Sequence, residues 1–201
     1  MENDEYPVYL QKLGAAAGVY IRTLDDVKTA LKQRLDYFAS CGCRLSDQSF
    51  GSPDFTIWDE EAAQEAMRKA LDGEVPLDYE VSAYQSLLMD FLGGEYAARG
   101  FTMQLHLGAL RNLNTKRFQA LGADIGCDSI GDGIPAASLA SLLDRLALRD
   151  ALPKSILYTL NASDNEKLIA AAGCFHDGAT AGKVQFGSAW WFKRPSGRHG
   201  K

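Results

Sequence analysis

The 201-residue sequence has no run of about eighteen apolar residues, the length that a membrane-spanning helix requires. It also has no basic excess, because 21 Lys and Arg are set against 26 Asp and Glu, giving a formal net charge of -5. Without a basic face the chain cannot neutralise many phosphates, which argues against a nucleic-acid partner. The N-terminus, MENDEYPVYL, lacks the basic and then apolar segments of a secretory signal. We therefore expect a cytoplasmic protein that binds neither membranes nor nucleic acid.

Residues that bind soft metals are scarce, with four cysteines and three histidines in the whole chain. Cys41 and Cys43 are one residue apart, whereas a zinc knuckle has a spacing of about two to four. Cys127 and Cys174 have no neighbouring partner at all. We expect the four cysteines to be small buried hydrophobes in a reducing compartment, rather than a disulfide or metal set.

The composition, 46% hydrophobic and 23% charged, is typical of a globular protein with a sizeable core. Apolar residues recur at helical spacing in several stretches, each bounded by capping residues, Gly or Pro. The predicted helices are Tyr6 to Gly18, Thr23 to Ser40, Asp59 to Leu71, Asp78 to Arg99, Pro135 to Leu148 and Ser163 to Ala172, the last starting with a capping box.

Short apolar runs between these helices predict strands. They are Cys43 to Asp47, the run that begins at Phe101, Ser155 to Leu160 and Lys183 to Gly187. Lys116 to Leu121 fits either one helical turn or a loop, and Cys127 to Asp132 reads as a polar turn. Strands that alternate with helices in this way predict an α/β fold with a parallel sheet.

The segment FTMQLHLGALRNLN, Phe101 to Asn114, concentrates the polar groups of the chain at one strand end. It brings together His106, Arg111, Asn112 and Asn114, a set suited to a polar, anionic small molecule. The alternative is that His106 is a hydrogen-bonded strand residue and Arg111 an ordinary surface charge. The carboxyl ends of parallel strands are where such folds bind ligands, which is the reason to weigh the first interpretation.

The other predicted strands also finish in distinctive residues, and this repetition favours a functional site over a structural explanation. The residues concerned are Asp47 after the first strand, Asn161 with Asp164 after the third, and Trp190 with Trp191 after the fourth.

Five motifs, GCRLSD, QLHLGALRNLN, DSIGD, ILYTLNASDNE and KVQFGSAWWF, resemble in order and spacing the second half of uronate isomerase (glucuronate isomerase). The resemblance runs from about Tyr6 to Phe192. That family belongs to the amidohydrolase superfamily and has a (β/α)8 barrel. The resemblance implies a partial barrel of about four βα units with an extra helical pair, as a single domain over residues 1–192.

The resemblance also implies an activity, the aldose–ketose isomerisation of D-glucuronate to D-fructuronate and of D-galacturonate to D-tagaturonate. Such a reaction needs an acid, a base and a group that polarises the carbonyl. Asp47, His106 and Arg111 are the expected catalytic residues, with Arg111 suited to the sugar carboxylate. The expected substrate-binding residues are Asn112, Asn114, Trp190 and Trp191, although the tryptophan pair could equally be core.

Several family features have no counterpart in this sequence. The family pattern Ser-Asp-His reads Ser46-Asp47-Gln48 here, and a metal-binding His-x-His is absent. The intact family uses a divalent, zinc-type metal. Because these family features are missing here, we expect the metal site of this chain to be incomplete and stoichiometric zinc to be absent.

A whole barrel needs about 250 residues, which predicts a fragment that has little or no activity alone. Residues 193–201 read as a disordered basic tail. The alternative function is a non-catalytic sugar-acid-binding or interaction module. Uncovered sheet edges would favour a homo-oligomer.

Overall fold

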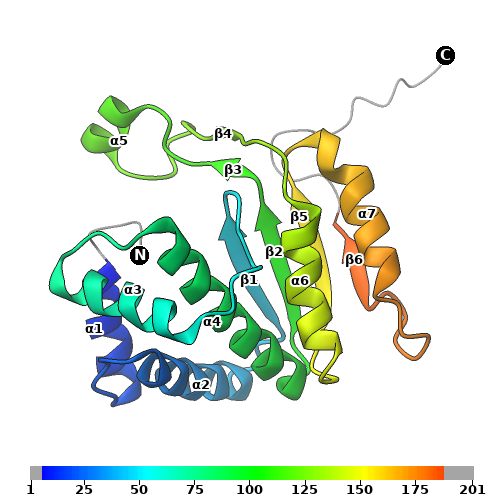
Figure 1. Cartoon of the computed structure of the whole chain (residues 1–201), viewed down its shortest axis with the longest axis horizontal. Coiled ribbons are helices and arrows are strands. Elements are labelled where there is room, and N and C mark those ends of the chain that lie inside the picture. The colour runs from blue at the N-terminus through cyan, green and yellow to red at the C-terminus, as the bar shows by residue number, and fades with distance from the viewer. Residues whose placement is uncertain (1–5, 188–201) are drawn as a thin grey trace.

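The structure is a computed structural model that describes residues 6–187, in which helices and strands alternate along most of the chain (Figure 1). The helices are α1 (Tyr6–Ala17), α2 (Leu24–Ser40), α3 (Glu60–Asp72), α4 (Asp78–Arg99), α5 (Thr115–Leu121), α6 (Ala136–Ala147) and α7 (Asn165–Cys174). The strands are β1 (Leu45–Phe50), β2 (Thr102–Leu107), β3 (Ala109–Leu110), β4 (Ser129–Ile130), β5 (Lys154–Thr159) and β6 (Val184–Phe186).

Four of the strands form one parallel sheet in the order β1-β2-β5-β6. Each follows its neighbour through at least one helix, as parallel pairing requires. The two-residue strands β3 and β4 form a separate antiparallel pair beyond the end of β2 (Figure 1). The predicted α/β fold with a parallel sheet is therefore confirmed.

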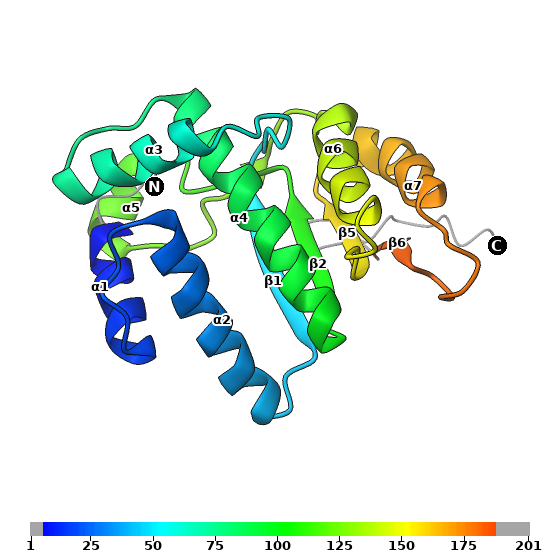
Figure 2. The same cartoon turned by 60° about the horizontal axis from the view of Figure 1, so that its bottom comes forward.

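One face of the sheet is covered by helices, with α4 and α6 lying in front of the strands in Figure 2 and α7 beyond α6, near β6. The side chains of Met103, Leu105 and Leu107 point to this face and are fully buried. They join Leu157 of β5 and a row of leucines on α6 in the main core. Burial of a side chain of this size stabilises a fold by about 1.5 to 3 kcal/mol, so this face holds the sheet in place.

A second core lies among α1, α2, α3 and the first half of α4. The hydroxyls of Tyr6 and Tyr84 share a hydrogen bond within it, and burial raises the pKa of Tyr6 to about 12. α3 and α4 are the extra helical pair that the sequence predicts between the first two strands.

Capping residues fix the helix starts where the sequence places them. Thr23 accepts a hydrogen bond from the backbone N–H of Asp26 and completes a capping box at α2. Asp59 accepts from the backbone N–H of Ala62 at 2.9 Å and caps α3. Both helices begin within one residue of the predicted position.

The first strand differs from its prediction, because β1 continues past Asp47 to Phe50. Asp47 therefore lies in the middle of the strand and not at its end. Gln48 and Ser49 look like the start of a loop, but they pair in parallel register with β2.

The predicted capping box at Ser163 is wrong. A 3-10 turn, Ala162–Asp164, precedes α7, and the cap is Asn161, whose side chain accepts from the backbone N–H of Ser163 at 3.1 Å. The polar turn predicted at Cys127 to Asp132 contains β4.

The cysteines also depart from their expected positions. All four are free thiols, but Cys41 and Cys174 are exposed and Cys43 and Cys127 half-buried, so none is a fully buried core residue.

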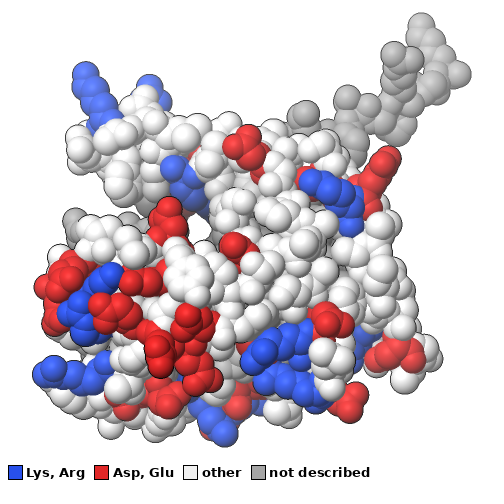
Figure 3. All heavy atoms as spheres, viewed as in Figure 1, with Lys and Arg blue, Asp and Glu red and all other residues white. Residues whose placement is uncertain are grey.

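Within residues 6–187, none of the helices combines the length and the apolar character needed to cross a bilayer. Acidic side chains gather on the surface over α3 in Figure 3.

Candidate active site

The second face of the parallel sheet carries polar side chains from three adjacent strands. The strand register places Asp47 opposite Gln104 and His106 opposite Tyr158. Directly paired residues of parallel strands point to the same side, so these four share a face. None of them is fully buried, in contrast to the residues on the helix-covered face.

His106 is held by contacts on two sides. Its Nδ1 lies 2.6 Å from Asp47 Oδ1, and its ring stacks on that of Tyr158 with centroids 4.5 Å apart and planes 11° apart. The side chain of His106 is 15% exposed and that of Asp47 60% exposed. Because an ionised carboxylate only accepts hydrogen bonds, Nδ1 carries the proton and Nε2 is the basic nitrogen of the neutral ring.

Sequence reasoning missed Tyr158 and Gln104, which complete this group. The Tyr158 hydroxyl donates to Gln104 Oε1 at 3.1 Å and so fixes the ring that stacks on His106. Gln104 lies two residues before His106, and residues at that spacing in a strand point to the same face. This spacing was the sequence signal that could have identified Gln104. Tyr158 lies inside the apolar run ILYTL, where a tyrosine reads as core.

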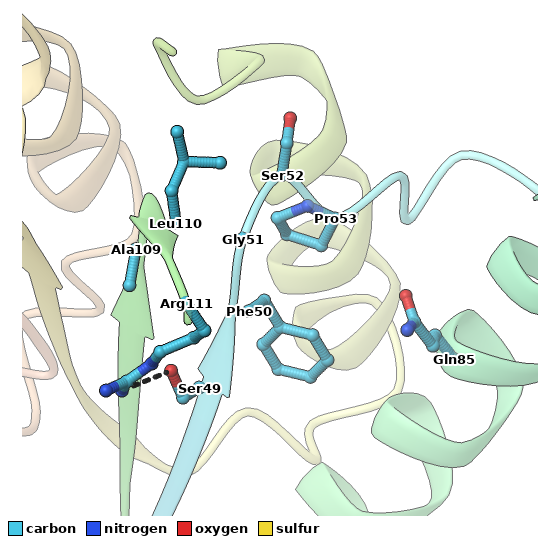
Figure 4. A pocket seen from close by; sticks show the side chains of 9 residues that line it. All are labelled: Ser49, Phe50, Gly51, Ser52, Pro53, Gln85, Ala109, Leu110 and Arg111. Atoms are coloured by element: carbon cyan, nitrogen blue, oxygen red, sulfur yellow. Dashed lines mark hydrogen bonds between the residues drawn. The ribbon is translucent and has the colours of Figure 1, made fainter. Parts of the chain in front are cut away.

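A cavity of about 460 Å³ opens at the carboxyl ends of β1 and β2. In Figure 3 the surface is hollowed between the lobe that carries α5 and the body of the molecule. The cavity is lined by Ser49, Phe50, Gly51, Ser52, Pro53, Gln85, Ala109, Leu110 and Arg111 (Figure 4).

Arg111 connects this cavity to the polar sheet face. Its Nη2 donates to Ser49 Oγ at 3.4 Å, the contact drawn in Figure 4. Ser49 lies opposite His106 in the register and two residues after Asp47. The sequence-predicted Asp47 and His106 thus lie on one sheet face, and Arg111 reaches that face through Ser49.

Asp128 binds Nη1 of Arg111, the terminal nitrogen that does not contact Ser49. This role of Asp128 was not predicted. Asp128 Oδ2 accepts from Arg111 Nη1 at 2.6 Å, and Oδ1 accepts from the backbone N–H of Asn112 at 2.8 Å. The Asn112 N–H is the main cause that lowers the pKa of Asp128, against the effect of desolvation, and Arg111 adds to the lowering. The signal available was the acidic motif DSIGD, which nothing in the sequence connects to Arg111.

The two predicted substrate-binding asparagines have backbone roles in this structure. Asn112 adopts a positive φ of 55°, which the short turn after β3 requires. The Asn114 side chain accepts from the backbone N–H of Arg117 at 3.0 Å and caps α5. Neither belongs to the lining of the cavity.

Asn161 and Asp164 hold the loop that leads into α6. Asn161 Nδ2 donates to the Gly131 carbonyl at 3.2 Å. The fully buried Asp164 accepts from the backbone N–H of Ile134 at 3.0 Å and lies 2.5 Å from Lys167 Nζ. Asn161 and Asp164 therefore hold the backbone between β4 and α6, and neither lines the cavity.

Gln48, the position where the motif departs from Ser-Asp-His, lies on the helix-covered face. Its Nε2 donates to the Tyr96 hydroxyl of α4 at 2.6 Å. Trp190 and Trp191, and the predicted basic tail of residues 193–201, lie outside the described residues.

The described residues offer few donors for a divalent metal. Within residues 6–187, no group of three or more His, Cys, Asp or Glu side chains is arranged to hold a metal ion. Asp47 and His106 supply two donor residues, one fewer than the three protein ligands of a typical catalytic zinc site. The described residues therefore do not fit a complete metal site.

Comparison with known proteins gives a consistent result. The family profile described as glucuronate isomerase matches residues 1–197. The uronate isomerases of Salmonella typhimurium and Salmonella enteritidis are each 47% identical to this chain over 193 residues, covering 96% of it. The chain spans 41% of the length of these relatives.

Two solved structures are also similar over 95% of the chain. The uronate isomerase of Thermotoga maritima has a TM-score of 0.84 at 28% identity, with 41% of that protein covered. The glucuronate isomerase of Caulobacter crescentus has a TM-score of 0.80 at 22% identity, with 38% covered, a likeness of fold alone.

Proposed function

The chain belongs to the glucuronate isomerase family, and from that premise we propose that its open sheet face carries part of a uronate isomerase active site. The observation that supports this most is the contact of His106 with Asp47, on the same sheet face as Ser49, to which Arg111 donates. The proposed substrates are D-glucuronate, converted to D-fructuronate, and D-galacturonate, converted to D-tagaturonate.

The reaction moves one proton between two carbons and needs no oxidant. A base removes the proton from C2, the electrons of that C–H bond form the C1–C2 double bond, and O1 takes up a proton. The enediol then loses the proton from O2, C2 becomes the carbonyl carbon, and C1 receives a proton. Each step is a general acid–base transfer.

His106 is the proposed proton carrier between C2 and C1. Its Nε2 accepts the proton, and Asp47 at Nδ1 fixes the ring and stabilises the imidazolium that forms. Arg111 pairs with the sugar carboxylate and so sets the distance from that end of the sugar to the reacting carbons. Asn112, Asn114, Trp190 and Trp191 stay as proposed contacts to the sugar.

The proposed architecture is a portion of a (β/α)8 barrel formed by residues 1–192, in which the open face is the barrel interior. Four parallel strands in the order β1-β2-β5-β6 and the likeness to the Thermotoga protein support it. A metal of the intact family would supply Lewis-acid chemistry. Because the described residues do not fit a complete metal site, the proposed roles rest on the side chains alone.

Calorimetry with D-glucuronate tests the substrate assignment. Arg111→Ala should weaken binding by about tenfold or more, because losing a charged hydrogen-bond partner costs about 1.5 to 3 kcal/mol. Arg117→Ala, an exposed arginine on α5, is the matched control and should bind as the wild type does. Equal losses in both variants, or no binding by the wild type, would refute the assignment.

A coupled assay for D-fructuronate tests turnover. We expect little or none from this chain alone, since it spans about two fifths of its relatives. Uronate binding that depends on Arg111, without any proton exchange at C2, would favour the alternative function of a sugar-acid-binding module. A rate near that of a full-length isomerase would refute the incomplete-site account.

A further inference from the structure

The segment between β2 and α6 folds back on itself, so that the Asp128 side chain contacts the Arg111 guanidinium. β3 and β4 pair antiparallel, with Ala109 opposite Ile130 and Leu110 opposite Ser129. The backbone N–H of Leu113 donates to the Cys127 carbonyl at 2.9 Å and continues the pairing. Asp128 therefore lies opposite the loop that carries Arg111, although 17 positions separate them in sequence.

Each carboxylate oxygen of Asp128 has one partner. Oδ1 fixes the backbone N–H of Asn112, the residue with φ of 55°, and Oδ2 fixes Arg111 Nη1. The first contact fixes the course of the backbone directly after Arg111, and the second fixes the plane of its guanidinium. The Asp128 side chain is 6% exposed, so water has little access to replace either contact.

The other edge of the guanidinium faces the cavity. Nη2 reaches toward Ser49 Oγ of β1, the contact drawn as a dashed line in Figure 4. The Arg111 side chain is 39% exposed and lines the cavity, while its Nη1 donates to Asp128. A guanidinium binds carboxylate through two parallel N–H groups, and that mode requires its plane to be fixed.

We propose that Asp128 is a positioning residue, which orients Arg111 so that the cavity selects a sugar carrying a carboxylate over the same sugar without that charge. The inference rests on the proposed function, because it takes Arg111 as the carboxylate anchor. Asp128 acts through Arg111 and does not touch the sugar.

Its test compares two ligands and three variants of the purified chain. The ligands are D-glucuronate and its neutral amide, D-glucuronamide, each titrated by calorimetry. Asp128→Asn keeps an oxygen that can accept from the Asn112 N–H but removes the charge opposite Arg111. Asp128→Ala removes both contacts, and Asp132→Asn, an exposed aspartate in the same motif, is the matched control.

Asp128→Asn should weaken glucuronate binding about tenfold, the effect of losing one charge-assisted hydrogen bond, and leave glucuronamide binding within about twofold. Asp128→Ala should weaken the binding of both ligands, and Asp132→Asn should change neither. Reaction of Arg111 with phenylglyoxal, followed by mass spectrometry, should be faster in Asp128→Asn than in the wild type. The reason is that Arg111 Nη1 loses its charged partner in the variant.

Three results would overturn the inference. Equal losses for the acid and the amide in Asp128→Asn would show that Asp128 only supports the loop, and unchanged glucuronate binding would show no role at all. If the wild-type chain binds neither ligand, the proposed function fails first and the inference fails with it.

Discussion

Leu105 and His106 are neighbours on β2 but face opposite sides of the sheet. Leu105 lies against the helices and is fully buried, whereas His106 lies on the open face beside Asp47 and Tyr158. The same alternation sets Met103 and Leu107 apart from Gln104. A parallel sheet is normally covered on both faces by apolar packing, so a face with polar side chains among residues 6–187 stands out as a place for ligand chemistry. One face of this strand packs in the core, and the other carries residues of the candidate site.

The largest stability effect is expected on the covered face. Leu105→Ala should lower the free energy of unfolding by about 2 to 5 kcal/mol, because it opens a cavity in the main core. The neighbouring Gln104→Ala should cost less than about 1 kcal/mol, because Gln104 is half-buried on the open face. Urea denaturation of both variants measures the difference. Similar losses of unfolding free energy in the two variants would contradict the claim that the helix-covered face provides most of the stability.

A smaller effect is expected where α4 and α6 come close together. A Cβ at Gly93 would lie 2.6 Å from Leu146 Cδ1, so Gly93→Ala should destabilise the chain by about 1 to 3 kcal/mol. Gly173 on α7 has no heavy atom within 4 Å of such a Cβ, and Gly173→Ala should stabilise by a few tenths to about 1 kcal/mol. Thermal denaturation checks the opposite signs. Destabilisation by both would show that the contact with Leu146 is not what sets the sign of the effect.

The smallest expected effect is on the stability of the fold at acid pH. The pKa of Asp128 is lowered in the folded chain, chiefly by the Asn112 N–H, so its ionised form stabilises the fold above the unfolded pKa of about 3.9. That contribution is lost as the pH falls from there through the lower folded-state pKa. Asp128→Asn should therefore flatten the acid side of the plot of stability against pH. An unchanged slope would show that the contacts of Asp128 do not persist in solution.

The covered face could be predicted from sequence far better than the open one. Helix spans such as α2 and α4 follow from apolar residues at three- and four-residue spacings, and Thr23 and Asp59 mark two of the starts. β1 was predicted to end too early, at Asp47, because the polar residues Gln48 and Ser49 that follow read as loop. A polar strand face has no sequence signal that separates it from a turn.

The candidate site was predicted only in part, for a similar reason. Asp47, His106 and Arg111 carry their chemistry in their residue types and follow apolar runs. Asp128 reaches Arg111 only through the β3–β4 pair, and two-residue strands leave no periodicity to read. Tyr158 becomes a site residue through its register with His106, which depends on tertiary structure.

The most direct test of the account is proton exchange at C2 of D-glucuronate in D2O, followed by NMR, since it requires only the first half of the reaction. The account predicts that the wild-type chain exchanges this proton and that His106→Ala lowers the rate by about 10²-fold or more, the usual contribution of a general base. His176→Ala, a change of an exposed histidine after α7, is the matched control and should keep the wild-type rate. An unchanged rate in His106→Ala, or a rate for the wild type no higher than that of free imidazole, would contradict the claim that the open sheet face carries the chemistry.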